Sequence, residues 1–167
     1  DVALRNSRRL LRLVNQLLDF QRIGAGKRSF EMQTHNLVEF TRICGDYVGS
    51  TGKTRGIGFG VLVNDKPIES DTQPIHSQVD LDALEKITMN FLSNGLKFTP
   101  RGGSVQLKLD VNEDKARLSV QDTGSGIPKE ALEDLFAVFS QVDGTTTREH
   151  EGSGLGLALA KELTEGM

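Results

Sequence analysis

The sequence of 167 residues contains no tryptophan, one tyrosine, one cysteine and four prolines. The single cysteine, Cys44, excludes an internal disulfide and is compatible with a reducing cytoplasm, so stability must come from a packed core. No apolar run approaches the roughly 20 residues of a transmembrane helix, and no signal peptide is evident. We therefore expect a cytoplasmic domain with one core, although a membrane anchor elsewhere in a longer parent protein stays open.

The first 28 residues carry an excess of positive charge. They contain seven Lys or Arg and two Asp, a net charge of +5, which leaves −8 on the rest of a chain whose net charge is −3. Apolar residues recur between the arginines at helical spacing, which predicts an amphipathic helix over residues 1–23 that ends at Gly24 and Gly26. The basic residues are confined to one helix without interleaved aromatic residues, which favours a solvated face over nucleic-acid binding.

A polar stripe is predicted on a helix over residues 80–98. Asn90, Asn94 and Lys97 are at i, i+4 and i+7, so they project from one face of that helix. Amide oxygens suit a magnesium ion, which prefers oxygen ligands, and the lysine adds a positive charge one turn further along. Taken alone, the pattern also fits an ordinary solvated face. On the opposite side we expect an apolar stripe that packs against a sheet, formed by Leu84, Ile87, Phe91, Gly95 and Phe98.

Asp122 ends an alternating run, RLSVQD, that predicts a strand. A carboxylate there can accept a hydrogen bond from the exocyclic amine of adenine, which guanine lacks at the same ring position. Gly124 and Gly126 allow a sharp turn and a close approach to a flat ring, and Pro128 is expected to begin a helix. An ordinary turn between a strand and a helix is the alternative interpretation.

Three glycines at alternate positions, Gly152, Gly154 and Gly156, lie at the start of a predicted helix. Backbone amides at such a start can line a phosphate, which the helix dipole favours. Position 157 is Leu, so the pattern is not the dinucleotide-binding fingerprint. A second segment, GSTGKT at 49–54, resembles the end of a P-loop, but Tyr47 occupies the place of its first glycine and the flanking elements are in the wrong order.

In sequence order, the motifs N-x-x-x-N-x-x-K, D-x-G-x-G, L-F-x-x-F and G-x-G-x-G resemble the N, G1, F and G2 boxes of sensor histidine kinases. The catalytic domain of that family belongs to the Bergerat-fold (GHKL) ATPases, and the resemblance extends from about residue 28 to the end of the chain. It implies ATP and magnesium as cofactors, with Asn94 as the principal magnesium ligand and Asn90 as a second contact to the ion. Lys97 would contact phosphate, and Asp122 would read the adenine amine.

The same resemblance implies roles for the glycines and for the segment before the last helix. The glycines that would act as hinges or face the phosphates are Gly124, Gly126, Gly152, Gly154 and Gly156. Residues 140–153 become polar after Val142, which predicts a mobile lid over the nucleotide. Phe136 and Phe139 resemble the aromatic pair at the root of that lid. Arg148 is expected to reach the terminal phosphates, with a solvated loop charge as the alternative.

The helix over 1–23 resembles the second helix of the dimerisation and phosphoacceptor domain of histidine kinases, which pairs in the four-helix bundle of a homodimer. This implies two parts, namely that helix with its junction over 1–26 and an ATP-binding domain over 27–167. None of the three histidines, His35, His76 and His150, matches the phosphoacceptor motif. The acceptor histidine is therefore expected outside this sequence, on the same or a partner protomer, with a response regulator downstream.

The expected architecture is a two-layer α/β sandwich, in which helices cover one face of a mixed sheet. The family's last two strands have no counterpart here, so the final hairpin of the sheet is expected to be absent, and Gly95 stands where the family usually has alanine. The predicted elements are helices over 1–23, 36–48, 80–98, 128–134 and 154–165 and strands near 28–34, 56–63, 75–79, 104–111 and 115–121.

The function that the resemblance implies is transfer of the γ-phosphoryl group of ATP to a histidine. Two alternatives stay open. A GHKL ATPase that clamps a dimer uses a hydrolytic glutamate, and the corresponding position here resembles Asn90. A module that only senses ATP or serves as a scaffold is the other alternative.

Overall fold

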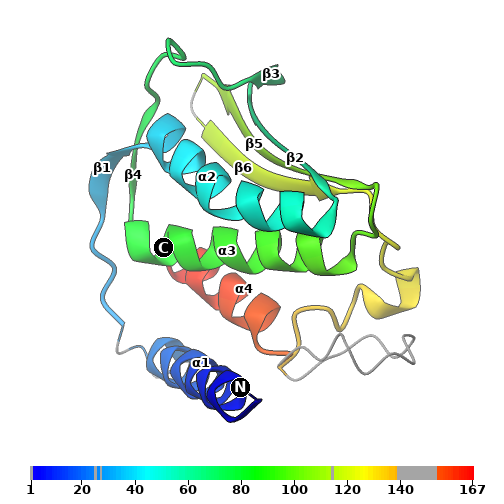
Figure 1. Ribbon diagram of the computed structural model, residues 1–167. Helices are drawn as coiled ribbons and strands as arrows, with labels where there is room; N and C mark the ends of the chain where they lie inside the picture. The colour runs from blue at the N-terminus through cyan, green and yellow to red at the C-terminus, as the bar shows by residue number, and fades with distance from the viewer. Residues whose placement is uncertain (1, 25, 27, 114, 139–153) are drawn as a thin grey trace. The chain divides into compact units, whose positions relative to one another are not determined.

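The computed structural model describes residues 2–24, 26, 28–113, 115–138 and 154–167 (Figure 1). Its residues group into two compact units, one formed by 1–30 with 127–167 and the other by 31–126. The last helix therefore groups with the first. The expected division into parts 1–26 and 27–167 stays a prediction about folding units. No helix among the described residues is long and apolar enough to cross a bilayer.

The unit over 31–126 contains two sheets and two helices (Figure 1). In chain order its elements are β1 (Gln33–Asn36), α2 (Leu37–Arg55), β2 (Gly58–Val63), β3 (Lys66–Pro67), β4 (His76–Val79), α3 (Leu81–Phe98), β5 (Ser104–Asn112) and β6 (Lys115–Asp122). The larger sheet has the order β3-β2-β5-β6, with β2 and β5 parallel and the other neighbours antiparallel. Strands β1 and β4 form a separate antiparallel pair. The mixed sheet with helices on one face confirms the expected fold class.

The described residues of the unit over 1–30 and 127–167 are mostly helical. It contains α1 (Val2–Gly24), the short 3₁₀ helix η1 (Lys129–Ala131) and α4 (Gly156–Gly166), and α1 and α4 contact each other. The predicted helix over 128–134 is wrong in type and length. Pro128 precedes η1 without a side-chain cap, and a single 3₁₀ turn follows it.

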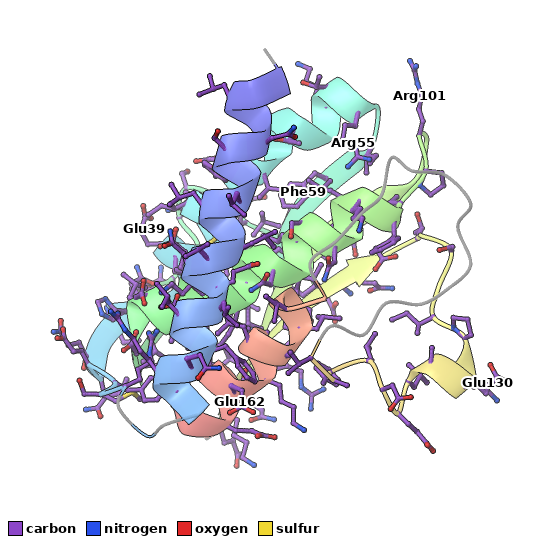
Figure 2. The ribbon with its side chains drawn as sticks, turned by 90° about the horizontal axis from the view of Figure 1, so that it is seen from below. Glu39, Arg55, Phe59, Arg101, Glu130 and Glu162 are labelled. Carbon is purple, nitrogen blue, oxygen red and sulfur yellow. The ribbon has the colours of Figure 1, made fainter. Side chains whose placement is uncertain are left out.

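The core of the 31–126 unit lies between the larger sheet and its two helices. Along β5, Val105, Leu107 and Leu109 are fully buried, while the residues between them face the other side of the sheet. This alternation is the period of two expected for a strand covered on one face. Phe59 of β2 lies on the same helix-covered side (Figure 2). Figure 2 also shows Arg55 at the end of α2 and Arg101 in the turn after α3.

Helix α2 is longer than predicted because its small residues serve packing. Sequence reasoning ended this helix near residue 48, where Gly, Ser and Thr become frequent, whereas α2 continues to Arg55. A Cβ atom built on Gly45 would lie 2.5 Å from Val61 Cγ2, and one on Gly52 would lie 3.3 Å from the Ile57 carbonyl oxygen. The glycines therefore let α2 approach β2 closely, and this tertiary contact outweighs their low helix propensity.

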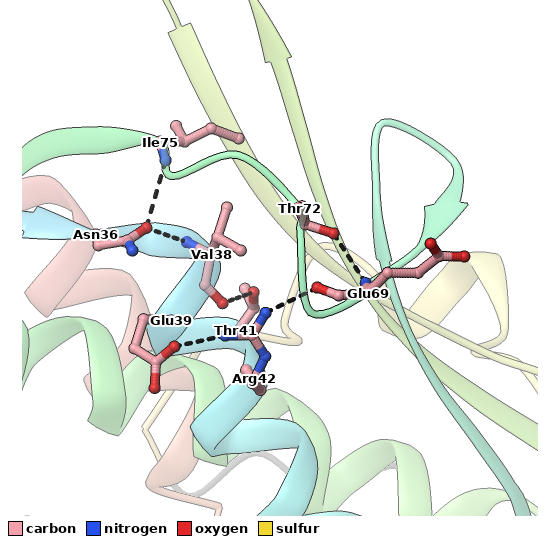
Figure 3. Close-up of polar contacts among 8 residues, drawn as sticks. All are labelled: Asn36, Val38, Glu39, Thr41, Arg42, Glu69, Thr72 and Ile75. Carbon is pink, nitrogen blue, oxygen red and sulfur yellow. Dashed lines mark hydrogen bonds and ion pairs between the residues drawn. The ribbon is translucent and has the colours of Figure 1, made fainter.

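Polar contacts fix the entry into α2 and the loop before β4 (Figure 3). The Asn36 side-chain oxygen accepts hydrogen bonds from Val38 N at 3.1 Å and Ile75 N at 3.3 Å, so one amide caps the helix and holds the loop. Arg42 pairs with Glu39 at 2.7 Å and donates to the Glu69 carbonyl oxygen at 2.9 Å. The first strand begins at residue 33, later than the predicted 28–34.

The carboxylate of Asp80, which is 5% exposed, fixes the start of α3. Its two oxygens accept hydrogen bonds from Ala83 N at 2.8 Å and Glu31 N at 2.9 Å. The same side chain therefore caps α3 and anchors the segment that enters β1.

We expect opposite effects from two alanine substitutions in α2. Gly45→Ala should lower the free energy of unfolding by about 1 kcal/mol, because crowding against Val61 costs about 1–3 kcal/mol and exceeds a helix-propensity gain of about 1 kcal/mol. At Gly49 the nearest atom to an added Cβ is Phe59 Cδ1 at an ordinary 3.7 Å. Gly49→Ala should therefore raise stability by up to about 1 kcal/mol. Urea unfolding of both variants measures this, and equal shifts would contradict the packing argument.

We also expect a pH dependence from Cys44, which is 4% exposed. Burial raises the pKa of this thiol from 9.0 to about 11, and the charge of Glu85 adds to the rise. The unfolded chain therefore loses this proton first as the pH increases, so the contribution to stability is complete below pH 9 and disappears as the pH rises to about 11. The difference between unfolding curves of the wild type and Cys44→Ala isolates this group, and a difference that stays constant between pH 8 and 11 would exclude it.

Candidate functional site

Helix α3 carries the three polar residues that the sequence placed on one face. Asn90, Asn94 and Lys97 are each partly exposed. The amide nitrogen of Asn90 donates to the Lys86 carbonyl oxygen at 2.9 Å, one turn earlier in the helix. This bond occupies the donor side of the amide, and the structure gives no partner for the side-chain oxygen within the residues it describes. The Asn90 oxygen is thus available as an acceptor or a cation ligand.

The expected apolar side of α3 is partly wrong. The buried residues of the helix body are Thr88, Leu92, Gly95 and Leu96, whereas Phe91 is 37% exposed and Phe98 is 44% exposed. A Cβ built on Gly95 would lie 3.2 Å from Val105 Cγ1, so Gly95 lies on the face of the helix that approaches the sheet. The helix is therefore rotated relative to the expectation, and the two phenylalanines flank the polar stripe.

Lys97 and Phe98 form a contact that sequence reasoning missed. The ammonium nitrogen lies 4.6 Å from the centroid of the Phe98 ring, within the range of a cation–π interaction. Burial lowers the pKa of Lys97 from its ordinary value of 10.5. In the sequence, the only sign of this contact is that Lys97 and Phe98 are adjacent. The apolar periodicity of the helix assigned Phe98 to the buried side instead. The exposed ring thus gives the ammonium group a neighbour on its own helix.

Asp122 lies at the end of β6, opposite Val105 of β5. Its Oδ1 accepts a hydrogen bond from Gly124 N at 2.8 Å, which closes a tight turn. The next residue, Thr123, ties this turn to β5 through Ser104, whose N donates to Thr123 Oγ1 at 2.9 Å. The exposed carboxylate is held by its own backbone, and its second oxygen remains for a donor from outside.

Gly124 brings this turn against the C-terminal end of α3. A Cβ at Gly124 would lie 2.7 Å from the Phe98 carbonyl oxygen and 2.7 Å from Asp122 Oδ1. The structure therefore places the Lys97–Phe98 pair next to the Asp122 turn within one unit. Gly126, the last residue of this unit, has φ +71°. That conformation favours glycine, as the turn prediction required.

The remaining predicted residues lie elsewhere. Gly154, with φ +65°, and Gly156 precede and begin α4 in the other unit. Phe136 in the same unit is 39% exposed. Phe139, Arg148, Gly152 and the predicted lid over 140–153 lie outside the described residues.

The donor chemistry of α3 fits a magnesium ion. Magnesium prefers oxygen ligands, keeps several waters and needs only one or two protein groups when phosphates supply the rest. The Asn90 oxygen is an available acceptor, and Asn94 lies one turn further on the same face. Within the described part of the chain no group of three or more His, Cys, Asp or Glu could form a protein-only metal site. The asparagine pair, with its amide oxygens, is the candidate position for an ion that arrives with its ligand.

Comparisons with known proteins point in one direction. Residues 79–167 match the family described as histidine kinase-, DNA gyrase B-, and HSP90-like ATPase. The chain is 34% identical over 168 residues to hybrid signal transduction histidine kinase D of Dictyostelium discoideum. The aligned region covers 98% of this chain and 10% of that protein. It is also 34% identical over 166 residues to sensor histidine kinase WalK of Bacillus subtilis, over 98% of this chain and 26% of that protein.

Among solved structures, full-length ShkA in complex with AMPPNP superposes with a TM-score of 0.80 at 31% identity, covering 99% of this chain and 33% of that chain. The similarity thus includes α1 as well as the sheet. The chain spans from a tenth to a third of the length of these three proteins.

We expect Gly124→Ala to destabilise the Asp122 turn, because the added methyl meets a backbone carbonyl that cannot rotate away. The cost should be about 1–3 kcal/mol in the free energy of unfolding. Gly60→Ala is the matched control, since no described atom lies within 4 Å of a Cβ built there. Denaturant unfolding compares the two, and a Gly124→Ala protein as stable as the control would show that the turn does not need this approach.

Proposed function

Since the chain belongs to the histidine kinase-, DNA gyrase B-, and HSP90-like ATPase family, as an ATP-binding catalytic domain of the histidine kinase type, we propose that it supports transfer of the γ-phosphoryl group of Mg-ATP to a histidine outside these 167 residues. One observation carries the proposal beyond the family. The Asn90–Asn94–Lys97 stripe runs toward the end of α3 that Gly124 approaches from the Asp122 turn, so the proposed metal, phosphate and base contacts would all come from one compact unit.

The residues of this unit have distinct proposed roles. Asn94 and Asn90 hold the magnesium ion, which when bound neutralises phosphate charge and orients the terminal phosphate. Lys97, held over Phe98, contacts a phosphate oxygen. Asp122 accepts a hydrogen bond from the adenine amine with the oxygen that its own turn leaves free. Gly126 completes the turn beside the base.

The motifs and the family give proposed roles to further residues, which belong to the other unit or lie outside the described residues. The amides around Gly154 and Gly156, together with Gly152, face the phosphates at the start of α4. From the motifs alone, Phe139 is proposed for the root of the lid and Arg148 for a contact to the terminal phosphates. These roles rest on the motifs and on the family, and α4 itself supplies the helix start that they require.

Phosphoryl transfer of this kind passes through a loose transition state, so positioning and charge stabilisation supply most of the catalysis. The domain then needs no general base of its own. Asn90 is consistent with this, because its amide donates to the Lys86 carbonyl and cannot take a proton from water. The position therefore favours transfer over the hydrolysis that a glutamate would promote.

The proposed partners follow from α1 and from the family. Leucines of α1 remain exposed at heptad spacing, with Leu4 52%, Leu11 61% and Leu18 50% exposed. Such a stripe suits a helix bundle, and we propose that α1 of two copies pair in a homodimer that presents the acceptor histidine. A response regulator would receive the phosphoryl group, and the domain would work in the cytoplasm.

The test is reconstitution with a separately prepared phosphoacceptor helix pair and radiolabelled Mg-ATP. Acid-labile, base-stable label on the helix pair is the expected result. Release of free phosphate without label would instead favour a clamp ATPase, and tight nucleotide binding with neither product would favour a sensor. Either of these outcomes overturns the kinase proposal.

Asp122→Asn is expected to weaken ATP binding by about tenfold to a hundredfold, the loss of one hydrogen bond to a charged group. The asparagine oxygen can still accept the hydrogen bond from Gly124 N, so the turn is retained. The NH2 group of the asparagine would then face the adenine amine, and two donors form no hydrogen bond. Asp71→Asn, in the exposed loop before β4, is the matched control. Calorimetric titration with Mg-ATP measures both, and equal affinities would remove Asp122 from the base-reading role.

A further inference from the structure

Asn94 is the only one of the seven asparagines in the chain that is followed by a glycine. In an Asn-Gly pair no side chain shields the peptide nitrogen of the second residue, and glycine leaves the backbone more conformational freedom than any other residue. That nitrogen can attack the side-chain amide carbon of the asparagine when the backbone allows the two atoms to meet. The pair lies near the C-terminal end of α3, inside the candidate site.

The folded helix holds these two atoms apart. Asn94 and Gly95 are both helical residues of α3. In an α-helix ψ is about −42°, and each N–H donates to the carbonyl oxygen four residues earlier. The attack needs a different ψ at Asn94 and a Gly95 nitrogen released from that hydrogen bond. The reaction is therefore confined to molecules in which this part of α3 has opened.

Two features of the helix end act on such an opening in opposite directions. Gly95 is buried, and a Cβ built on it would lie 3.2 Å from Val105 Cγ1 and 3.5 Å from Val120 Cγ1, so its backbone packs against β5 and β6. However, the helix ends at Phe98, where the Thr99 N donates to the Gly95 carbonyl oxygen at 3.0 Å, and glycine lowers helix stability relative to alanine. Local opening of this end, without global unfolding, is therefore expected.

The packing also explains why a reactive pair is present in a helix. The distance to Val105 is shorter than an ordinary van der Waals contact, so a side chain at position 95 would crowd the strand. The close approach of α3 to the sheet therefore favours, directly after Asn94, the residue that makes Asn94 reactive.

We propose that Asn94 is a site of spontaneous deamidation that operates through local opening of the C-terminal end of α3. In the open state the Gly95 nitrogen gives its proton to hydroxide and bonds to Asn94 Cγ. The bond from Cγ to the side-chain nitrogen then breaks, and that nitrogen leaves as ammonia with a proton taken from water. Water hydrolyses the resulting cyclic imide at either carbonyl carbon, which gives aspartate or isoaspartate.

Either product changes the candidate site. Aspartate replaces a neutral amide with a negative charge near the proposed phosphate contacts. Isoaspartate also lengthens the main chain by a carbon atom, which displaces Gly95 from Val105. Both should weaken Mg-ATP binding, and bound Mg-ATP should in turn protect Asn94 by holding α3 closed. This consequence rests on the proposed function, whereas the deamidation itself does not.

The test incubates the folded full chain in mildly alkaline buffer and follows individual asparagines by mass spectrometry of proteolytic peptides. Asn90 is the matched internal control, since it lies on the same face of the same helix but is followed by Phe91, whose side chain shields the nitrogen. We expect the mass gain of NH2 replaced by OH at Asn94 and none at Asn90. Equal modification of both residues, or of neither, would overturn the proposal.

Urea below the unfolding transition tests the local opening. The logarithm of the Asn94 rate should rise with urea less steeply than the global unfolding equilibrium does, because a local opening exposes less surface. A slope equal to that of global unfolding would show that the helix end does not open by itself.

Gly95→Ala should cause loss of the modification at Asn94, because the alanine methyl shields the nitrogen. The comparison is repeated in full denaturant, so that a variant too crowded against Val105 to fold still gives a result. There the wild type should react at Asn94 and the variant should not. Equal rates in denaturant would contradict the role of the glycine.

Added nucleotide separates this inference from the proposed function. Mg-ATP at about a hundred times its dissociation constant should slow the Asn94 reaction by about a hundredfold if the open helix does not bind it. Modification of Asn94 in a chain that shows no Mg-ATP binding by calorimetry would support the deamidation site and overturn the proposed function. Binding of Mg-ATP that leaves the rate unchanged would overturn the protection of α3 by the nucleotide.

Discussion

The close approach of α3 to β5 and β6 is the constraint on which the candidate site depends. Gly95 faces Val105 at a distance that leaves little room for even a methyl group, and Gly124 lies against the Phe98 carbonyl oxygen at the end of the same helix. These two contacts fix the polar stripe of α3 relative to the Asp122 turn. Backbone proximity therefore sets the geometry, and the side chains use it.

Glycine has a structural use in each part of this chain. In α2 it lets a helix approach β2, in the Asp122 turn it lets a loop approach a helix end, and at Gly166 it admits the Phe30 ring. At Gly56, the residue after α2, φ is +69°, a conformation that glycine adopts without strain. The loss of helix propensity at interior glycines is offset by the van der Waals contacts that close packing allows.

The side chains of the candidate site are held by neighbouring groups for which no role in binding is proposed. Asn90 is oriented by a backbone carbonyl of its own helix, Lys97 by an adjacent ring, and Asp122 by the amide of Gly124. Each support comes from within four residues along the chain. The site can therefore present an amide oxygen, an ammonium and a carboxylate in set directions before a ligand arrives, which reduces the conformational entropy lost on binding.

The sequence by itself determined the order of the motifs, the family they indicate and most element positions, because periodicity and spacing are local properties that secondary structure preserves. It also placed Asn90, Asn94 and Lys97 on one face of α3, where the structure has them. It could not determine the rotation of α3, which left Phe91 and Phe98 exposed, nor the continuation of α2 through GSTGKT. Tertiary contacts decided both, since the identity of the face that packs against a sheet depends on residues such as Val61 and Val105 that are distant in sequence. The grouping of α4 with α1 through Phe30 and Gly166 was decided in the same way, by a contact between chain segments that no local pattern links.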